Sequence, residues 1–142
     1  MTQQHLSTQT GSRWLIVGRL LISMVFFIGA CYNFFVTLRA PVIELGRLID
    51  LSPLAFIREL ARSIALPHAT IFVIVILLFE ISIAVSVLLR VAIRRRAYAA
   101  SLAFFLILAP LIGWYAVSNL IWALPALVLL YYDRPKLDTH AA

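Results

Sequence analysis

Glu80 is the side chain in this sequence whose position most strongly suggests chemistry. It is the only charged residue between Thr70 and Leu89, an apolar stretch long enough to cross a lipid bilayer. An ionised carboxylate is costly in hydrocarbon, so it must face other helices and either take up a proton or pair with a cation. Ionisable residues in such places mark proton relays and substrate paths, which makes Glu80 a candidate for proton transfer.

Arg19 is the cation available to Glu80. It is the only charged residue from Trp14 to Leu38 and lies near the start of that apolar stretch. Glu80 is expected at the bilayer centre, and Arg19 lies about six residues, or about 9 Å along the helix axis, from that level. An extended arginine and an extended glutamate side chain can nearly close this distance. We therefore predict that Arg19 and Glu80 form one site and assign both a catalytic role. A purely structural ion pair that fixes the helix register is the alternative.

Tyr32, Asn33 and His68 are the candidate cofactor-binding residues. Tyr32 and Asn33 lie near the far end of the first apolar stretch, where they could line a pocket at the level of the lipid headgroups. His68 lies at the start of the second stretch and is the only histidine near the membrane, because His5 and His140 fall in tails on the opposite side. A bis-histidine haem site within this chain is therefore not expected.

Other site chemistries are not indicated by the sequence. It has no glycine-rich phosphate loop, catalytic triad or metal-ligand cluster. Cys31 is the single cysteine, which excludes an intrachain disulfide. Residues 28–31 have the form of a lipoprotein processing box, so a cleaved and acylated N-terminus is an alternative to a first span. The charge of Arg19 and the apolar residues that follow Cys31 favour the span.

The composition predicts a membrane protein. Of the 142 residues, 63% are hydrophobic and 13% charged, whereas globular domains have about 45–50% apolar and about 25% charged residues. A soluble fold of this size could not bury so much apolar surface. The net charge of +6 comes from arginines that mostly flank apolar runs. There they set membrane orientation, so we expect lipids as partners and no nucleic acid.

The hydropathy pattern predicts an all-α integral membrane four-helix bundle. The uncharged run of 36 residues from Ala97 to Tyr132 must fold back, because one helix of that length would span about 54 Å against a hydrocarbon core of about 30 Å. Pro110 and Gly113 mark the reversal. The predicted organisation is a tail over 1–13, a transmembrane domain over 14–132 with spans at about 14–37, 70–89, 97–112 and 114–132, and a tail over 133–142.

The connections between these spans carry the charges. Residues 39–66 form an amphipathic segment between the first and second spans, in which Ser52 and Pro53 predict a helix start. We expect it to lie in the membrane interface or to cover the bundle. Residues 90–96 read as a basic hairpin before the third span. Eight basic residues fall on the side of both termini and four on the other, which predicts cytoplasmic termini in a bacterial cytoplasmic membrane.

The chain resembles the DoxX-like family of small four-helix membrane proteins. The matching segments are Val17-Gly18-Arg19-Leu20-Leu21, Phe26-Phe27-Ile28-Gly29, Phe79-Glu80, Leu88-Leu89-Arg90 and Arg134-Pro135-Lys136-Leu137-Asp138. The resemblance implies a membrane subunit associated with a redox enzyme that is quinone- or thiol-linked. In that case Arg19 and Glu80 organise a quinone or proton-linked site, and a protein partner carries the redox cofactor.

Two other functions are consistent with the same residues. The chain could be a non-catalytic scaffold, or a protein that binds lipid or another small molecule, in which Arg19 and Glu80 only hold the helices together. The other hypothesis is a small transporter in which residues 39–66 form the gate. Because each chain has one buried carboxylate, we would expect such a transporter to be a homo-oligomer. No inverted repeat supports transport.

Overall fold

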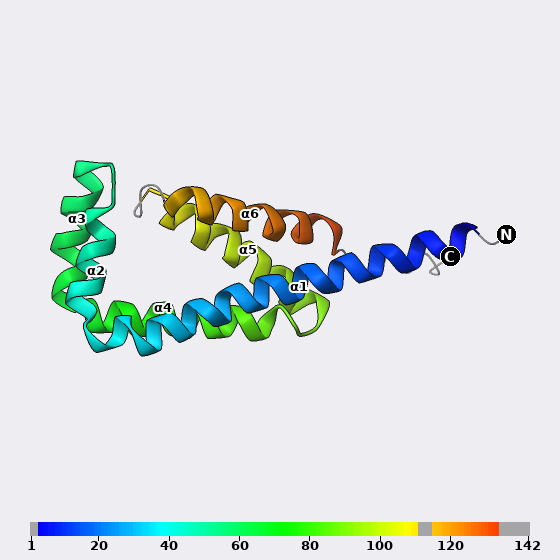
Figure 1. Ribbon diagram of the computed structural model, residues 1–142, viewed down its shortest axis with the longest axis horizontal. Coiled ribbons are helices and arrows are strands. Elements are labelled where there is room, and N and C mark those ends of the chain that lie inside the picture. Colours follow the sequence, from blue (N-terminus) through cyan, green and yellow to red (C-terminus); the bar gives the residue numbers. More distant parts are fainter. Residues whose placement is uncertain (1–2, 111–114, 134–142) are drawn as a thin grey trace.

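The chain is all-helical in the computed structural model, which describes residues 3–110 and 115–133. The predicted all-α class is confirmed. The elements, labelled in Figure 1, are α1 (Gln3–Phe35), η1 (Thr37–Arg39), α2 (Pro41–Asp50), α3 (Ala55–Ala65), η2 (Leu66–His68), α4 (Ala69–Ser86), α5 (Val91–Leu108) and α6 (Tyr115–Tyr132). The η elements are single 3-10 turns that link longer helices.

The helices pack as two antiparallel pairs with a hairpin across one end. Helix α1 packs along α4, and α5 packs along α6. Helices α2 and α3 form the hairpin and stand roughly perpendicular to α1 and α4 (Figure 1). The start of α1, the α4–α5 turn and the end of α6 all point to the opposite end of the molecule. The fold therefore has a hairpin end and a terminal end.

The core lies between the two helix pairs. Ile22 and Val87 are completely buried there, and Tyr98 is buried beside them. Small residues such as Ala126 allow the helices to approach closely, as in membrane helix packing. Four phenylalanines extend this core toward the hairpin end, with ring centroids 4.9–6.3 Å apart: Phe26, Phe79, Phe104 and Phe105.

Much of the exterior formed by the described side chains is apolar. Large hydrophobic side chains are exposed on every long helix, among them Met24, Ile71, Ile107 and Leu124. Two helical stretches are long and apolar enough to cross a membrane, over Arg13–Arg39 and Ala55–Ser86. Only 17% and 28% of their most apolar windows are buried, whereas the core helix of a soluble protein would be mostly covered. The exterior thus suits a lipid environment better than water.

The first helix begins earlier than predicted. We expected residues 1–13 to form a tail, but α1 starts at Gln3 and runs to Phe35 without a break. Extending an existing helix needs only one residue to be fixed for each new hydrogen bond, so a polar segment without proline can continue an apolar helix. The two residues before it, 1–2, lie outside the described part of the chain.

The amphipathic segment forms two helices, and neither begins at Ser52 or Pro53 as predicted. Helix α3 begins at Ala55, after Leu54 in an extended conformation. Ser52 is 2% exposed and donates a hydrogen bond from Oγ to the carbonyl oxygen of Pro110 at 2.9 Å. Its hydroxyl therefore ties the α2–α3 turn to the end of α5 and does not cap a helix.

The predicted basic hairpin over 90–96 is also wrong. The turn ends at Arg90, and α5 begins at Val91, so Arg94, Arg95 and Arg96 lie within the helix. Arg94 is 7% exposed and donates from Nη1 to the carbonyl oxygen of Leu89 at 2.9 Å. A buried partner for one of the three arginines explains why they do not form a solvated loop.

The last two helices follow the expected reversal. Helix α5 spans Val91–Leu108 and α6 spans Tyr115–Tyr132, against predicted spans of about 97–112 and 114–132. Gly113, one of the two residues taken as the reversal, lies outside the described residues, whereas Pro110 follows the end of α5.

Candidate ligand-binding cavity

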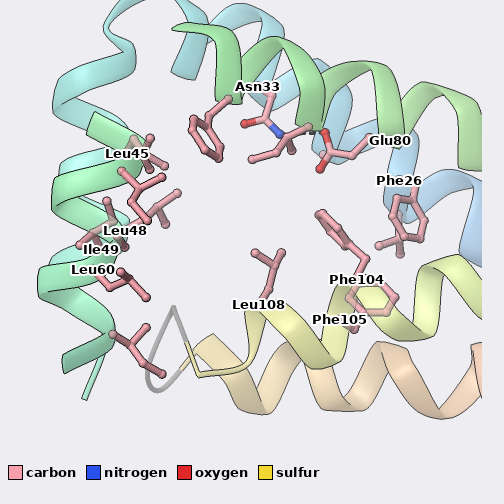
Figure 2. Close-up of a pocket in the computed structure, with 18 residues that line it drawn as sticks. Phe26, Asn33, Leu45, Leu48, Ile49, Leu60, Glu80, Phe104, Phe105 and Leu108 are labelled. Atoms are coloured by element: carbon pink, nitrogen blue, oxygen red, sulfur yellow. Dashed lines mark hydrogen bonds between the residues drawn. The ribbon is translucent and has the colours of Figure 1, made fainter. Parts of the chain in front are cut away.

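A cavity of about 520 Å³ lies between the α2–α3 hairpin and the helix bundle. Its size is within the range of small-molecule sites, about 300–1,000 Å³. Figure 2 shows its lining residues arranged around an open centre, with the hairpin on one side and the phenylalanines on the other. Five helices, α1 to α5, contribute to the walls. The cavity is therefore a product of the whole fold and not of a single loop.

Glu80 and Asn33 supply the polar atoms of this cavity. The other described lining residues are apolar. Asn33 donates from Nδ2 to Oε2 of Glu80 at 2.7 Å, which joins α1 to α4 at one edge of the cavity (Figure 2). Glu80 is only 7% exposed. Its carboxyl group can accept a hydrogen bond from a ligand when ionised and donate one when protonated.

Gly29 provides the space that the Glu80 carboxyl group occupies. A Cβ atom at Gly29 would lie 2.7 Å from Oε1 of Glu80, closer than non-bonded carbon and oxygen atoms approach. Helix α1 therefore comes close to α4 at this residue, and one carboxylate oxygen rests against its backbone. The other oxygen accepts the hydrogen bond of Asn33.

The apolar walls come from both sides of the molecule. The hairpin contributes aliphatic side chains, including Leu45, Ile49 and Leu60, and α5 contributes Phe104 and Phe105 (Figure 2). A salt bridge of 2.6 Å between Arg62 and Asp50 links the two helices of the hairpin, and the hydrogen bond of Ser52 links the hairpin to the bundle. A ligand in the cavity would thus meet hydrocarbon on most of its surface.

The expected pair of Arg19 and Glu80 is not formed. Glu80 packs against Gly29, and Arg19 precedes Gly29 on the same helix by about ten residues, or about 15 Å. Arg19 instead donates from Nη2 to Oδ1 of Asp133 at 3.1 Å. The register of α1 against α4 is therefore different from the one that the hydropathy pattern suggested, and the cation is outside the cavity. A catalytic role for Glu80 stays a prediction.

Of the three predicted cofactor-binding residues, the structure places one in the cavity. Asn33 lines it directly. Tyr32 is 53% exposed and His68 is exposed in η2, and neither lines the cavity. Neighbouring residues of an α-helix point in directions about 100° apart. Because Asn33 faces the cavity, the ring of Tyr32 points to the outside.

A second polar cluster lies at the terminal end of the molecule, centred on Asp133. This carboxylate accepts hydrogen bonds from Arg94 through Nε and Nη2, from Arg19 through Nη2, and from the Tyr98 hydroxyl at 3.3 Å. The prediction that Asp133 belongs to a polar tail is wrong, because its side chain is 6% exposed. Its position directly after 36 uncharged residues was the signal in the sequence.

This cluster joins three helices through hydrogen bonds between its own side chains. Arg94 and Asp133 are buried, and their hydrogen bonds use both oxygens of the carboxylate. The arrangement suits a structural role that joins the middle of α1 to the start of α5 and the end of α6. No group of three or more histidine, cysteine or acidic side chains within the described ranges could hold a metal ion.

Gly29→Ala is expected to displace the Glu80 carboxyl group while the fold is retained. The clash involves the end of a flexible side chain, and alanine is favoured over glycine in a helix by about 1 kcal/mol. Thermal unfolding should therefore be unchanged or shifted upward, and the infrared carboxyl band of Glu80, assigned with Glu80→Gln, should shift.

Gly46→Ala is the matched control for this variant. Its new Cβ atom would lie 3.9 Å from the nearest Leu66 atom, an ordinary contact. The carboxyl band should stay in place in this variant. An unshifted band in Gly29→Ala would contradict the close approach of α1 to Glu80.

Comparisons of the chain with family models, with curated proteins and with solved structures give no match.

Proposed function

We propose that the chain is a four-span integral membrane protein that binds an apolar small molecule with a hydrogen-bonding head. The observation that carries the proposal is the apolar cavity of about 520 Å³ in which the carboxyl group of Glu80 and the amide of Asn33 meet at one edge. Few, well-placed polar groups in an otherwise apolar cavity are typical of sites that orient a ligand by its head.

Several features support the membrane part of this proposal. The exposed surface is rich in large apolar side chains, and two helical stretches are long enough to span a bilayer. Helices α5 and α6 have 18 residues each, or about 27 Å, which is close to the thickness of the hydrocarbon core. The excess of arginine at the terminal end favours cytoplasmic termini, in a bacterial cytoplasmic membrane.

A quinone is the ligand class that fits these groups best. Its ring carries oxygen atoms that are hydrogen-bond acceptors as carbonyls and donors as hydroxyls in the reduced form, and a carboxyl group can partner either. The phenylalanines beside Glu80 offer rings for stacking, and the aliphatic hairpin offers a surface for an apolar tail. On this proposal Glu80 exchanges the proton of the quinone oxygen.

Binding of decylubiquinone to the purified protein in mild detergent tests this proposal. We expect saturable binding of one molecule per chain, measured by equilibrium dialysis at several detergent concentrations. The control ligand is decylbenzene, which has the apolar tail but no oxygen atoms and should bind more weakly. Equal affinity for the two ligands, or partition that does not saturate, would contradict a site with a polar head group.

We also propose that the chain serves as the membrane subunit of a redox complex. The DoxX-like resemblance of its first and second apolar stretches supports this, and both Glu80 and Gly29 lie in the matching segments. On this proposal the electron-carrying cofactor belongs to the protein partner. Purification of the tagged chain from its native membrane should recover a partner with a flavin or haem absorbance spectrum. A colourless chain without a stoichiometric partner would count against a redox complex.

A membrane lipid is the second candidate ligand, because the cavity reaches the exterior. Leu60 and Ile64 line it and are 46% and 53% exposed. An acyl chain of a lipid could thus enter the cavity from the surrounding bilayer. Mass spectrometry of the extracted protein separates the two candidates: a bound phospholipid that decylubiquinone does not displace would favour the lipid.

A further inference from the structure

Three arginines at the start of α5 have no part in the cavity or in the Asp133 cluster. Arg90, Arg95 and Arg96 line a groove between α5 and the end of α6, with a volume of about 710 Å³. The groove lies at the terminal end, whereas the Glu80 cavity lies toward the hairpin. We refer to it as the arginine groove. Its charge requires an explanation of its own.

Helical geometry separates these arginines from the buried one next to them. Arg94 points inward and shares Asp133 with Arg19. Arg95 and Arg96 are rotated by about 100° and 200° from Arg94 around the axis of α5. Their side chains therefore leave the helix on other sides than the buried side chain of Arg94. Arg90 precedes the helix in an extended conformation and brings a third guanidinium group to the same groove.

The charges of the groove are not neutralised within the described residues. The described carboxylates other than Asp133 are Glu44, Asp50 and Glu59 on the hairpin and Glu80 in the cavity. None of them forms a salt bridge with an arginine of the groove. The Nε atom of Arg95 is buried and has no hydrogen-bond partner. The groove therefore presents three positive charges that no described carboxylate neutralises.

Apolar surface adjoins these charges. Leu130 of α6 and the alanines Ala92 and Ala99 of α5 complete the lining. Leu89 and Ile93, which flank the start of α5, are exposed large hydrophobic residues. A ligand that fits both features has an anionic head and a hydrocarbon body. Guanidinium groups bind phosphate through paired hydrogen bonds, which points to a phosphate head.

We infer that the arginine groove binds the phosphate headgroup of an acidic phospholipid. The headgroup contacts Arg90, Arg95 and Arg96, and the acyl chains lie along the exposed apolar face of α5 and α6. The inference rests on the membrane insertion proposed above but not on the ligand of the Glu80 cavity. It gives the basic cluster a binding role in addition to its effect on orientation.

Native mass spectrometry of the purified full chain with phosphatidylglycerol and phosphatidylcholine tests this inference. We expect the wild-type protein to prefer phosphatidylglycerol. The double variant Arg95→Gln/Arg96→Gln should bind it about thirtyfold more weakly, because each basic residue near an anionic lipid surface changes affinity by about a factor of five. Arg95→Lys/Arg96→Lys keeps the charge and should retain most of the affinity.

The matched control is Arg39→Gln/Arg58→Gln, which removes the same net charge at the hairpin end. Its affinity for phosphatidylglycerol should stay within about twofold of wild type, since neither residue lines the groove. An equal loss in both double variants would overturn the site in favour of non-specific charge attraction. Displacement of phosphatidylglycerol by inorganic phosphate at similar concentration would overturn the lipid as the source of the phosphate.

Binding of decylubiquinone provides the independent readout. Arg95→Gln/Arg96→Gln should leave it unchanged, because the two sites share no lining residue. A loss of both ligands together would indicate a damaged fold and overturn the assignment of a separate site. A failure of decylubiquinone binding in the wild-type protein, with phosphatidylglycerol binding intact, would contradict only the proposed function.

Discussion

Asp133→Ala is expected to lower the free energy of unfolding by about 3–5 kcal/mol, the usual cost of removing one partner of a buried ion pair. Asp133 is the carboxylate that neutralises Arg94, whose side chain is 9% exposed, and it also accepts a hydrogen bond from Arg19. Its removal leaves two guanidinium groups facing each other without an anion. Reversible unfolding in mixed micelles of detergent and sodium dodecyl sulfate measures the change.

Asp50→Ala is the matched control for the stability measurement. Asp50 and Arg62 form a salt bridge of 2.6 Å, but their side chains are 56% and 45% exposed. Exposed pairs contribute less than about 1 kcal/mol. The double variant Arg94→Leu/Asp133→Leu should recover part of the loss, because two apolar groups replace the buried pair. Similar losses in Asp50→Ala and Asp133→Ala would refute a central role for the buried carboxylate.

Glu80→Leu is expected to weaken the binding of decylubiquinone about ten- to a hundredfold. Hydrogen bonds to charged groups contribute about 1.5–3 kcal/mol, and each 1.4 kcal/mol is a factor of about ten in affinity. Leucine keeps this part of the cavity filled but removes both carboxylate oxygens. The dissociation constant from equilibrium dialysis, at fixed detergent concentration, is the quantity to compare.

Two further variants test whether the loss of affinity is specific to the carboxyl group of Glu80. Glu80→Gln retains an oxygen that can accept the hydrogen bond of Asn33, so its affinity should lie between those of wild type and Glu80→Leu. Glu59→Leu removes an exposed carboxylate outside the cavity and should leave the dissociation constant unchanged. If Glu80→Leu bound decylubiquinone as tightly as the wild-type protein, the head of the ligand would not be held at Glu80.

The helical class, the amphipathic connection and the burial of Glu80 could be predicted from the sequence. A carboxylate in an apolar helix must be buried against other helices, and the structure places Glu80 at 7% exposure. Its partner could not be predicted in the same way. Hydropathy gives the length of a helix but not its register against a neighbour. Arg19 and Asn33 are about four turns apart on the same helix, so the register decides which of them meets Glu80.

The remaining differences have a common physical origin in contacts that are distant in the sequence. Ser52 has the residue type of a helix cap, but its hydroxyl bonds to Pro110 in another helix pair. Arg94 resembles its neighbours Arg95 and Arg96, but it alone meets Asp133. A local pattern can predict that a residue is polar and near a helix end. Which partner it meets depends on how the helices are packed.

The Asp133 cluster has a consequence for the biosynthesis of the chain. Asp133 is separated from Arg19 by 114 positions and from Arg94 by 39. During translation both arginines leave the ribosome long before their carboxylate, so the first five helices carry an uncompensated charge until residue 133 has been made. Final docking of the helices must therefore wait for the last one. Chains truncated before this residue should stay loosely packed and should be degraded by membrane proteases.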